Sequence, residues 1–372
     1  MKKVFILFCM LVSLAFASDS SFDEVLTKAK QGDAEAQFYL GVMYAEGQGV
    51  RQDYKKAFEW LSKAANQGLA KAQYNLGVMY EKGHGVKQDY EKAAEWFSKA
   101  AKQGLAEAQY NLGVMYDRGY GVRQDYKKAF EWYSKAANQG LAEAQYNLGV
   151  MYEKGHGVRQ DYKKAFEWYS KAANQGLAEA QFYLGLMYVD GQGVRQDYKK
   201  AFEWYSKAAN QGDAEAQYNL GVMYAEGQGV RQDYKKAAEW FSKAANQGDA
   251  KAQYNLGVMY DRGYGVKQDY KKAFEWYSKA ANQGYANAQN NLGVMYANGQ
   301  GVRQDYKKAF EWYSKAANQG DANTQYNLGF MYANGQGVRQ DLKKAKEYFG
   351  LSCDSGLQLG CDAYRELNER GI

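Results

Sequence analysis

Residues 32–67 read GDAEAQFYLGVMYAEGQGVRQDYKKAFEWLSKAANQ, and nearly the same 36 letters recur in register up to residue 355. Nine complete copies cover 324 of the 372 residues. A fixed period of this length is typical of a solenoid, in which each repeat buries its apolar face only against its neighbours. The sequence therefore predicts one repeated unit of structure rather than two or three unrelated domains.

The composition follows from the repeat and excludes several classes of protein. The chain has no proline and 40 glycines, so a mucin stalk, a polyproline linker and a collagen helix are excluded. Three cysteines are too few for a scaffold held together by many disulfides. A formal net charge of +6 is too small for this length to point to nucleic acid.

The first residues are predicted to be an export signal. Lys2 and Lys3 precede the apolar run 4–16, and small residues, Ala15 and Ala17, occupy the positions that a signal peptidase reads. We expect cleavage after Ala17, which assigns residues 1–17 to a signal peptide. The run is shorter than the roughly 20 residues of a membrane helix, so no span is expected after cleavage; an uncleaved anchor is the alternative.

Each copy is predicted to begin with a helix. In the first copy Ala36, Leu40 and Tyr44 recur four residues apart, which places them on one apolar face. Gly47 and Gly49 then interrupt the helix and permit a turn with positive φ.

A second helix follows in each copy. Asp53 is the predicted N-cap, because its carboxylate can accept hydrogen bonds from free backbone N–H groups. Ala57, Trp60 and Ala64 share one face, and Gly68 ends the helix. We expect the Trp60 column, which holds all eight tryptophans, to supply the large buried side chain between the helices.

The residues that recur in every copy form a pattern found in one repeat family. The pattern consists of Ala34-x-Ala36, Leu40-Gly41, Tyr44, Gly47-x-Gly49-Val50, Asp53, Lys56-Ala57, Trp60, Ala64-Ala65 and Gly68. It resembles the Sel-1-like repeat, a relative of the tetratricopeptide repeat with a longer loop that carries glycine. The resemblance implies an all-α, right-handed α/α superhelical solenoid used for protein–protein interaction. It extends to the secreted, cysteine-rich bacterial branch of that family.

The two ends of the repeat array are predicted to be polar caps. Residues 18–31 align with the end of a second helix and would cover the first of the nine repeats at 32–355. Residues 356–372 resemble a polar first helix. Arg365 stands there in a column that is glycine in every complete copy, so the stack is expected to end at this helix.

Two cysteines of the mature chain are expected to form a disulfide. Cys353 falls late in a second helix and Cys361 early in the helix that follows, so the turn between them should bring the two positions face to face. An exported protein reaches an oxidising compartment, the periplasm or the cell exterior, in which such a bond persists. A nucleophilic or metal-binding cysteine is the alternative.

No catalytic or metal-binding residues stand out. The only histidines, His84 and His156, lie two copies apart in a loop column that also holds Gln and Tyr, so we expect exposed loop residues and no metal. Some members of the cysteine-rich branch are β-lactamases or penicillin binders, and the resemblance alone carries that possibility here. The Ser-x-x-Lys, Ser-Asp-Asn and Lys-Thr-Gly motifs are absent. We expect no cofactor.

The predicted binding site is a stripe on the first helices that would line a concave groove. One column of this stripe holds asparagines, whose amides can donate to and accept from a peptide backbone; related tetratricopeptide grooves use asparagine in this way. A column of apolar residues, mostly valine, runs beside it. The site residues are Asn75, Asn111, Asn147, Asn219, Asn255, Asn291 and Asn327 together with Val78, Val114 and Val150. The alternative is that both columns are solvated positions copied by duplication.

The sequence therefore predicts an exported scaffold that binds a protein or peptide, in the periplasm or outside the cell. An extended peptide segment along the groove is the expected ligand, and we expect a monomer that does not bind nucleic acid. Two alternatives remain open. One is an enzyme or binding protein for β-lactams or peptidoglycan fragments, and the other is a secreted factor that contacts host proteins.

Overall fold

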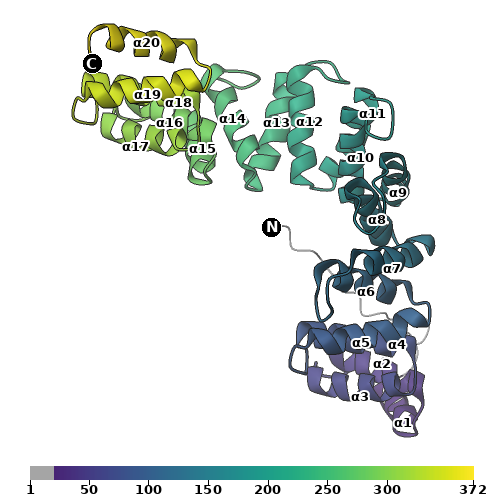
Figure 1. The fold of residues 1–372 in the computed structure, drawn as a ribbon. Helices are drawn as coiled ribbons and strands as arrows, with labels where there is room; N and C mark the ends of the chain where they lie inside the picture. Colours follow the sequence, from purple (N-terminus) through teal and green to yellow (C-terminus); the bar gives the residue numbers. More distant parts are fainter. Residues whose placement is uncertain (1–20) are drawn as a thin grey trace. The chain divides into compact units, whose positions relative to one another are not determined.

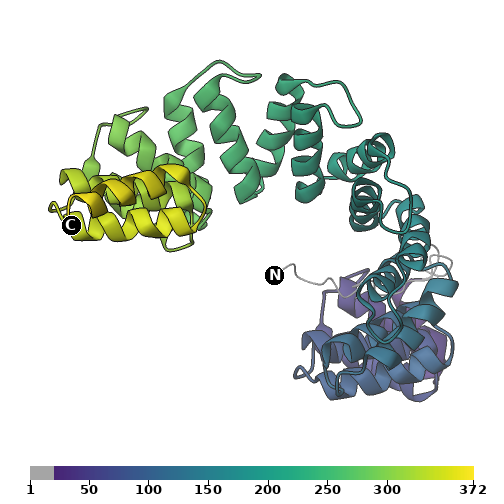
Figure 2. The same cartoon turned by 45° about the horizontal axis from the view of Figure 1, so that its top comes forward.

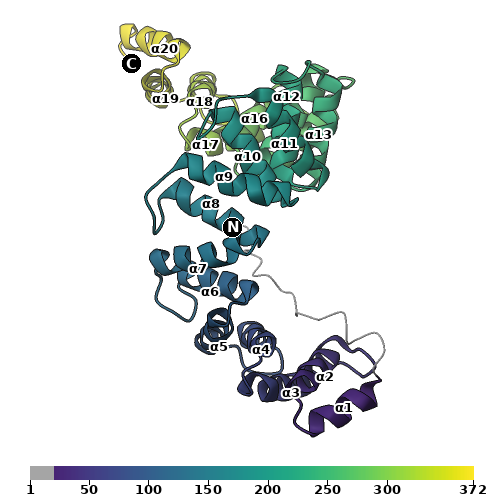
Figure 3. The same cartoon turned by 90° about the vertical axis from the view of Figure 1, so that its right-hand side faces the viewer.

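The computed structural model describes residues 21–372, and the predicted signal peptide lies outside them. The described residues form twenty α-helices and no strand (Figure 1). They divide after Gln196 into two compact units, one with α1–α10 and one with α11–α20. Within each unit a helix packs mainly on the helices that precede and follow it in the sequence (Figures 2 and 3). The predicted all-α solenoid is confirmed.

Each repeat contributes one first helix and one second helix. The first helices are α2 (Ala34–Glu46), α4 (Ala70–Lys82), α6 (Ala106–Arg118), α8 (Ala142–Lys154), α10 (Ala178–Asp190), α12 (Ala214–Glu226), α14 (Ala250–Arg262), α16 (Ala286–Asn298) and α18 (Ala322–Asn334). The second helices are α3 (Tyr54–Asn66), α5 (Tyr90–Lys102), α7 (Tyr126–Asn138), α9 (Tyr162–Asn174), α11 (Tyr198–Asn210), α13 (Tyr234–Asn246), α15 (Tyr270–Asn282), α17 (Tyr306–Ala317) and α19 (Leu342–Asp354). At the two ends lie α1 (Phe22–Lys30) and α20 (Gln358–Glu369).

The helix boundaries follow the predicted caps. Asp53 is the N-cap of α3, and its carboxylate accepts hydrogen bonds from the backbone N–H groups of Lys55 and Lys56 at 3.0 and 3.1 Å. Gly47 ends α2 in the left-handed conformation, with φ of +75°.

The two helices of a repeat approach closely where the first helix carries glycine. In α12, a Cβ built on Gly221 would lie 2.7 Å from ring carbon Cδ1 of Phe241 on α13. No side chain fits at that distance, so the Phe241 ring rests directly on the helix backbone. Other repeats place Phe or Tyr in the same position, including Phe97, Tyr133, Tyr169, Tyr277, Tyr313 and Phe349.

The prediction that tryptophan supplies the large buried side chain is wrong. Trp240 is half-buried, whereas Phe241, the next residue, is 3% exposed. One residue turns a helix by 100°, so the phenylalanine faces the partner helix and the indole lies at the edge of the interface. The Lys243 ammonium covers the Trp240 ring at 3.7 Å from its centroid. The same arrangement of lysine over tryptophan recurs at Trp168 and Lys171.

Consecutive repeats also meet at the loop between the two helices. Gly157 has φ of +70°, and a Cβ there would lie 2.1 Å from the backbone oxygen of Tyr126 in the preceding repeat. Next to it, the His156 ring stacks on Tyr126, with centroids 4.5 Å apart. His84 stacks on Tyr54 in the same way. The histidines are therefore half-buried contacts between repeats rather than simply exposed loop residues.

A buried glutamine network connects each turn to the neighbouring repeat. The Gln145 amide of α8 donates to the backbone oxygen of Ala137 at 3.1 Å. The Gln175 amide donates to the backbone oxygen of Gly140 and to Gln145 Oε1, both at 2.8 Å. We call this set the glutamine clamp. It adds hydrogen bonds to a carbonyl in the last turn of the second helix and to the carbonyl of the glycine that follows that helix.

The adjacent aromatic columns provide a test of the core. We expect Phe241→Ala to lower the free energy of unfolding by about 3–5 kcal/mol, because it removes a large, fully buried side chain from a close helix contact. Trp240→Ala should lower the free energy of unfolding clearly less, since the indole is half-buried. Chemical denaturation measures both. Hydrogen exchange should show the Phe241→Ala effect concentrated around α12 and α13. A larger loss for Trp240→Ala would contradict this assignment of the core.

Candidate functional site

The candidate stripe differs in accessibility along the chain. We define the inner stripe as the Asn and Val columns named above, carried by the first helices. In α4 and α6, Asn75 and Asn111 are 0% exposed, and Val78 and Val114 are 1% exposed. The remaining predicted residues are half-buried and reach the surface; they are Asn147, Val150, Asn219, Asn255, Asn291 and Asn327. The stripe is therefore most accessible on the helices of the second unit.

Within the second unit, the asparagines also contact one another and neighbouring groups. The Asn327 amide donates to Asn290 Oδ1 at 3.2 Å, and the Asn219 amide donates to the backbone oxygen of Glu215 at 2.9 Å. Burial raises the pKa of Tyr218, and the Asn255 side chain on the next first helix acts in the opposite direction. An asparagine of one repeat thus lies close enough to influence a tyrosine of the repeat before it. The sequence analysis did not identify this tyrosine column.

At α10 the asparagine column is interrupted by an aromatic cluster. Tyr183 takes the place of asparagine, and its ring stacks on Tyr169 with centroids 5.5 Å apart. The Tyr183 ring also packs against the Tyr146 ring, with centroids 5.6 Å apart. The Tyr169 hydroxyl donates to Glu153 Oε2 at 2.5 Å. Every polar group of Tyr169 is thus satisfied inside the protein.

One tyrosine of the same column in the second unit has a hydroxyl that is not satisfied. Tyr277 on α15 is 1% exposed, and its hydroxyl makes no hydrogen bond. Asp261 takes the place of Glu153 in this repeat, and its side chain is shorter by one methylene. Burial, and then the charge of Asp261, raise the pKa of Tyr277. The Asn291 side chain acts against this rise, but not in the geometry of a hydrogen bond.

This unpaired hydroxyl lies at a cavity of about 450 Å³ between α14, α15 and α16. Burial raises the pKa of the Asp261 carboxyl at the cavity, and Arg262 beside it acts in the opposite direction. The lining residues are Tyr254, Val258, Asp261, Arg262, Tyr264, Tyr277, Asn291, Val294, Met295 and Gln300. The predicted site residue Asn291 thus borders a hollow that also contains groups the sequence analysis missed.

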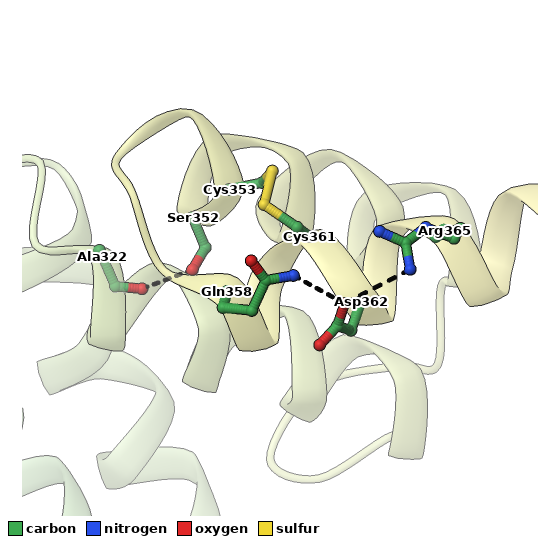
Figure 4. Close-up of a disulfide and its surroundings, with 7 residues drawn as sticks. All are labelled: Ala322, Ser352, Cys353, Gln358, Cys361, Asp362 and Arg365. Atoms are coloured by element: carbon green, nitrogen blue, oxygen red, sulfur yellow. Dashed lines mark hydrogen bonds and ion pairs between the residues drawn. A yellow bond between two sulfur atoms is a disulfide. The ribbon is translucent and has the colours of Figure 1, made fainter.

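The structure pairs the two C-terminal cysteines. Cys353 of α19 and Cys361 of α20 form a disulfide, with Cα atoms 4.5 Å apart (Figure 4). In the complete repeats the position of Cys361 is glutamine, whose amide donates to the carbonyl eight residues earlier, as Gln145 does to Ala137. Cys353 lies eight residues before Cys361. The disulfide therefore stands where the glutamine clamp would form.

Two serines contribute hydrogen bonds at the last turn, and one of them, Ser355, takes the place of the second clamp glutamine. The Ser355 hydroxyl donates to Gln325 Oε1 at 3.1 Å, and the Ser352 hydroxyl donates to the backbone oxygen of Ala322 at 2.8 Å (Figure 4 shows the second bond). Arg365 is exposed and lies 3.6 Å from Asp362. The final helix is less polar than predicted, because Leu359 and Tyr364 on it are exposed.

Among residues 21–372, no group of three or more His, Cys, Asp or Glu side chains is placed to hold a metal ion. In the same part of the chain, no helix combines the length and apolar character needed to cross a bilayer.

Comparison with known proteins gives a consistent result. The family described as "Sel1 repeat" matches nine consecutive segments, which are residues 34–69, 70–105, 106–141, 142–177, 178–213, 214–249, 250–285, 286–321 and 322–357. No curated protein shows a match.

Solved structures are also similar. A protective antigen present in uropathogenic Escherichia coli strains, described as displaying an SLR fold, is 36% identical with a TM-score of 0.79; the match covers 95% of this chain and 84% of that one. A Sel1 repeat protein from Oxalobacter formigenes is 39% identical with a TM-score of 0.64, covering 84% and 91%. Helicobacter pylori cysteine-rich protein B is 28% identical with a TM-score of 0.30, covering 35% and 94%.

The cysteine pair leads to a prediction about the C-terminal end. The mature protein should contain no free thiol, and a non-reduced digest should yield the Cys353 and Cys361 peptides linked. Replacing both cysteines by serine should speed hydrogen exchange in α20, because this helix has a neighbour on one side only. The loop is short, so the loss of stability should be near the low end of ~2–4 kcal/mol. Mass spectrometry that finds two free thiols would refute the pairing.

Proposed function

Because the chain belongs to the Sel1 repeat family, whose members are generally scaffolds for protein–protein interaction, we propose that it binds an extended peptide segment of a partner protein along the inner stripe. The observation that carries this proposal is the half-buried asparagine column of the second unit, set beside apolar residues and opening on a cavity. Half-buried amides keep hydrogen-bonding capacity at the surface, where a peptide backbone can use it.

The apolar column supports the same mode of binding. Val258 and Val294 line the cavity beside Asn291, and Phe330 on α18 continues the column with 48% of its surface exposed. An extended segment that lies across the first helices would place its backbone on the amides and alternate side chains on these apolar residues. When a partner covers an aromatic ring exposed to this extent, apolar surface is removed from water, which favours binding.

We also propose that the protein acts after export, as a monomer, in the periplasm or outside the cell. The apolar run that follows Lys2 and Lys3 supports this location. The cysteine pair supports it too, because a disulfide at the end of the array requires an oxidising compartment. The similar Escherichia coli protein is described as a protective antigen, which agrees with a role at or beyond the cell envelope.

A triple substitution in the second unit tests the binding face. Peptides selected from a displayed random library on the purified mature protein serve as ligands. Asn219, Asn255 and Asn291 replaced together by Ala should weaken their binding by about tenfold or more, because each lost hydrogen bond contributes roughly 0.5–1.5 kcal/mol. Fluorescence anisotropy measures the affinity, and circular dichroism and the melting temperature check that the fold is retained.

The matched control lies on the second helices. Lys236, Lys272 and Lys308 are exposed and lie over the rings of Tyr224, Tyr260 and Tyr296 at 5.1–5.4 Å. Replacing these three lysines by Ala should leave peptide affinity nearly unchanged. If the lysine variant no longer binds the peptides and the asparagine variant still binds them, the binding face lies on the second helices.

A further inference from the structure

The cavity at Tyr277 has the properties of a built subsite. Its buried hydroxyl is unpaired, and a buried polar group without a partner is destabilising. The hydroxyl is not required for packing, because Phe241 and Phe349 occupy the same position in other repeats against the same helical glycine. Tyr277 therefore carries a hydroxyl at a position where a phenyl ring is sufficient for folding.

The fourth repeat shows this position with a partner. There the Tyr169 hydroxyl donates to the Glu153 carboxylate at 2.5 Å. Asp261 occupies the place of Glu153 beside Tyr277, whose hydroxyl remains without a hydrogen bond. The same place holds Asp117 beside Tyr133, so the unpaired hydroxyl and the cavity, and not the aspartate alone, distinguish the Tyr277 repeat. The Tyr277 hydroxyl and the Asp261 carboxylate are a donor and an acceptor at one cavity that do not bond to each other.

The hydrogen-bonding groups at the cavity favour a neutral guest that both donates and accepts. The Asp261 carboxylate is partly withdrawn from water and can only accept, and the unpaired Tyr277 hydroxyl can donate. Arg262, the next residue, is exposed, so its charge stays in water. An anionic guest would be repelled by Asp261, and an ammonium group would leave the hydroxyl without an acceptor. Val258, Val294 and Met295 supply apolar walls that suit methylene groups.

We propose that this cavity is a subsite for a carboxamide side chain, that of glutamine or asparagine, from the bound segment. The amide nitrogen would donate to the Asp261 carboxylate, and the amide oxygen would accept from the Tyr277 hydroxyl. A carboxamide meets both requirements without adding charge, and its methylenes fit the apolar walls. The inference rests on the proposed peptide-binding function, for which it names the chemistry of one contact.

The test uses small probes and the full mature chain. The probes are the N-acetyl, N′-methylamide derivatives of glutamine, lysine and glutamate, titrated to the same concentration. NMR of protein with ¹³C-labelled tyrosine rings reports on the site, and the Tyr277 signal is identified by its absence in Tyr277→Phe. The glutamine probe should shift this signal in a saturable manner, and the lysine and glutamate probes should shift it much less.

Two variants make the result specific. Asp261→Glu should weaken binding of the glutamine probe by about tenfold or more. The longer side chain can accept a hydrogen bond from the Tyr277 hydroxyl, as Glu153 does from that of Tyr169, and would then compete with the probe. Glu153→Asp, the reverse change in the first unit, should leave the Tyr277 response unchanged. Both substitutions conserve charge, and the melting temperature confirms that each variant is folded.

Three outcomes would overturn the subsite. They are an equal or larger response to the lysine or glutamate probe, an unchanged response in Asp261→Glu, and no response to any probe. If the glutamine probe fails while selected peptides still lose affinity in the Asn219, Asn255 and Asn291 variant, only the subsite is wrong. If the glutamine probe binds and that variant keeps its peptides, the error lies in the proposed peptide stripe.

Discussion

The repeat depends on an aromatic ring that lies directly on a helical glycine. At Gly221 and Phe241 this contact sets the separation of the two helices, because a single methyl group would not fit between them. The remaining contacts of a repeat follow from this spacing. The tryptophan of the same helix is displaced to the edge, where a lysine covers it. The glutamine clamp then fixes the turn to the next repeat.

Much of the fold could be predicted from sequence because the period is visible in every column. The helix pairs, the Asp53 cap and the glycine that ends the first helix all followed from residue type and spacing. The identity of the buried aromatic could not, because Trp240 and Phe241 are adjacent and equally regular, and both look like core residues. The glutamine clamp was also missed, since an isolated glutamine is usually a surface residue.

Prediction of the candidate site was limited for a different reason. The asparagine and valine columns are recognisable as a stripe, but their accessibility differs between repeats and is not encoded in the repeat pattern. Asn75 and Asn291 have similar local sequences and different exposure. The cavity is bordered by Asp261, which stands where another repeat has Glu153, and by the Tyr277 hydroxyl, which is unpaired where that of Tyr169 is bonded. Nothing in the repeat pattern marks that difference as important.

The covalent bond between α19 and α20 makes the two ends of the array respond differently to tension. In the complete repeats the turn is held by hydrogen bonds, which can break and re-form one at a time, and the same holds at the first turn, where the Gln37 amide donates to the backbone oxygen of Ala29. At the last turn the Cys353–Cys361 bond cannot be opened by pulling alone. Tension can therefore open the turn between α1 and α2, whereas the turn between α19 and α20 stays closed even when the helices on either side of it are pulled apart.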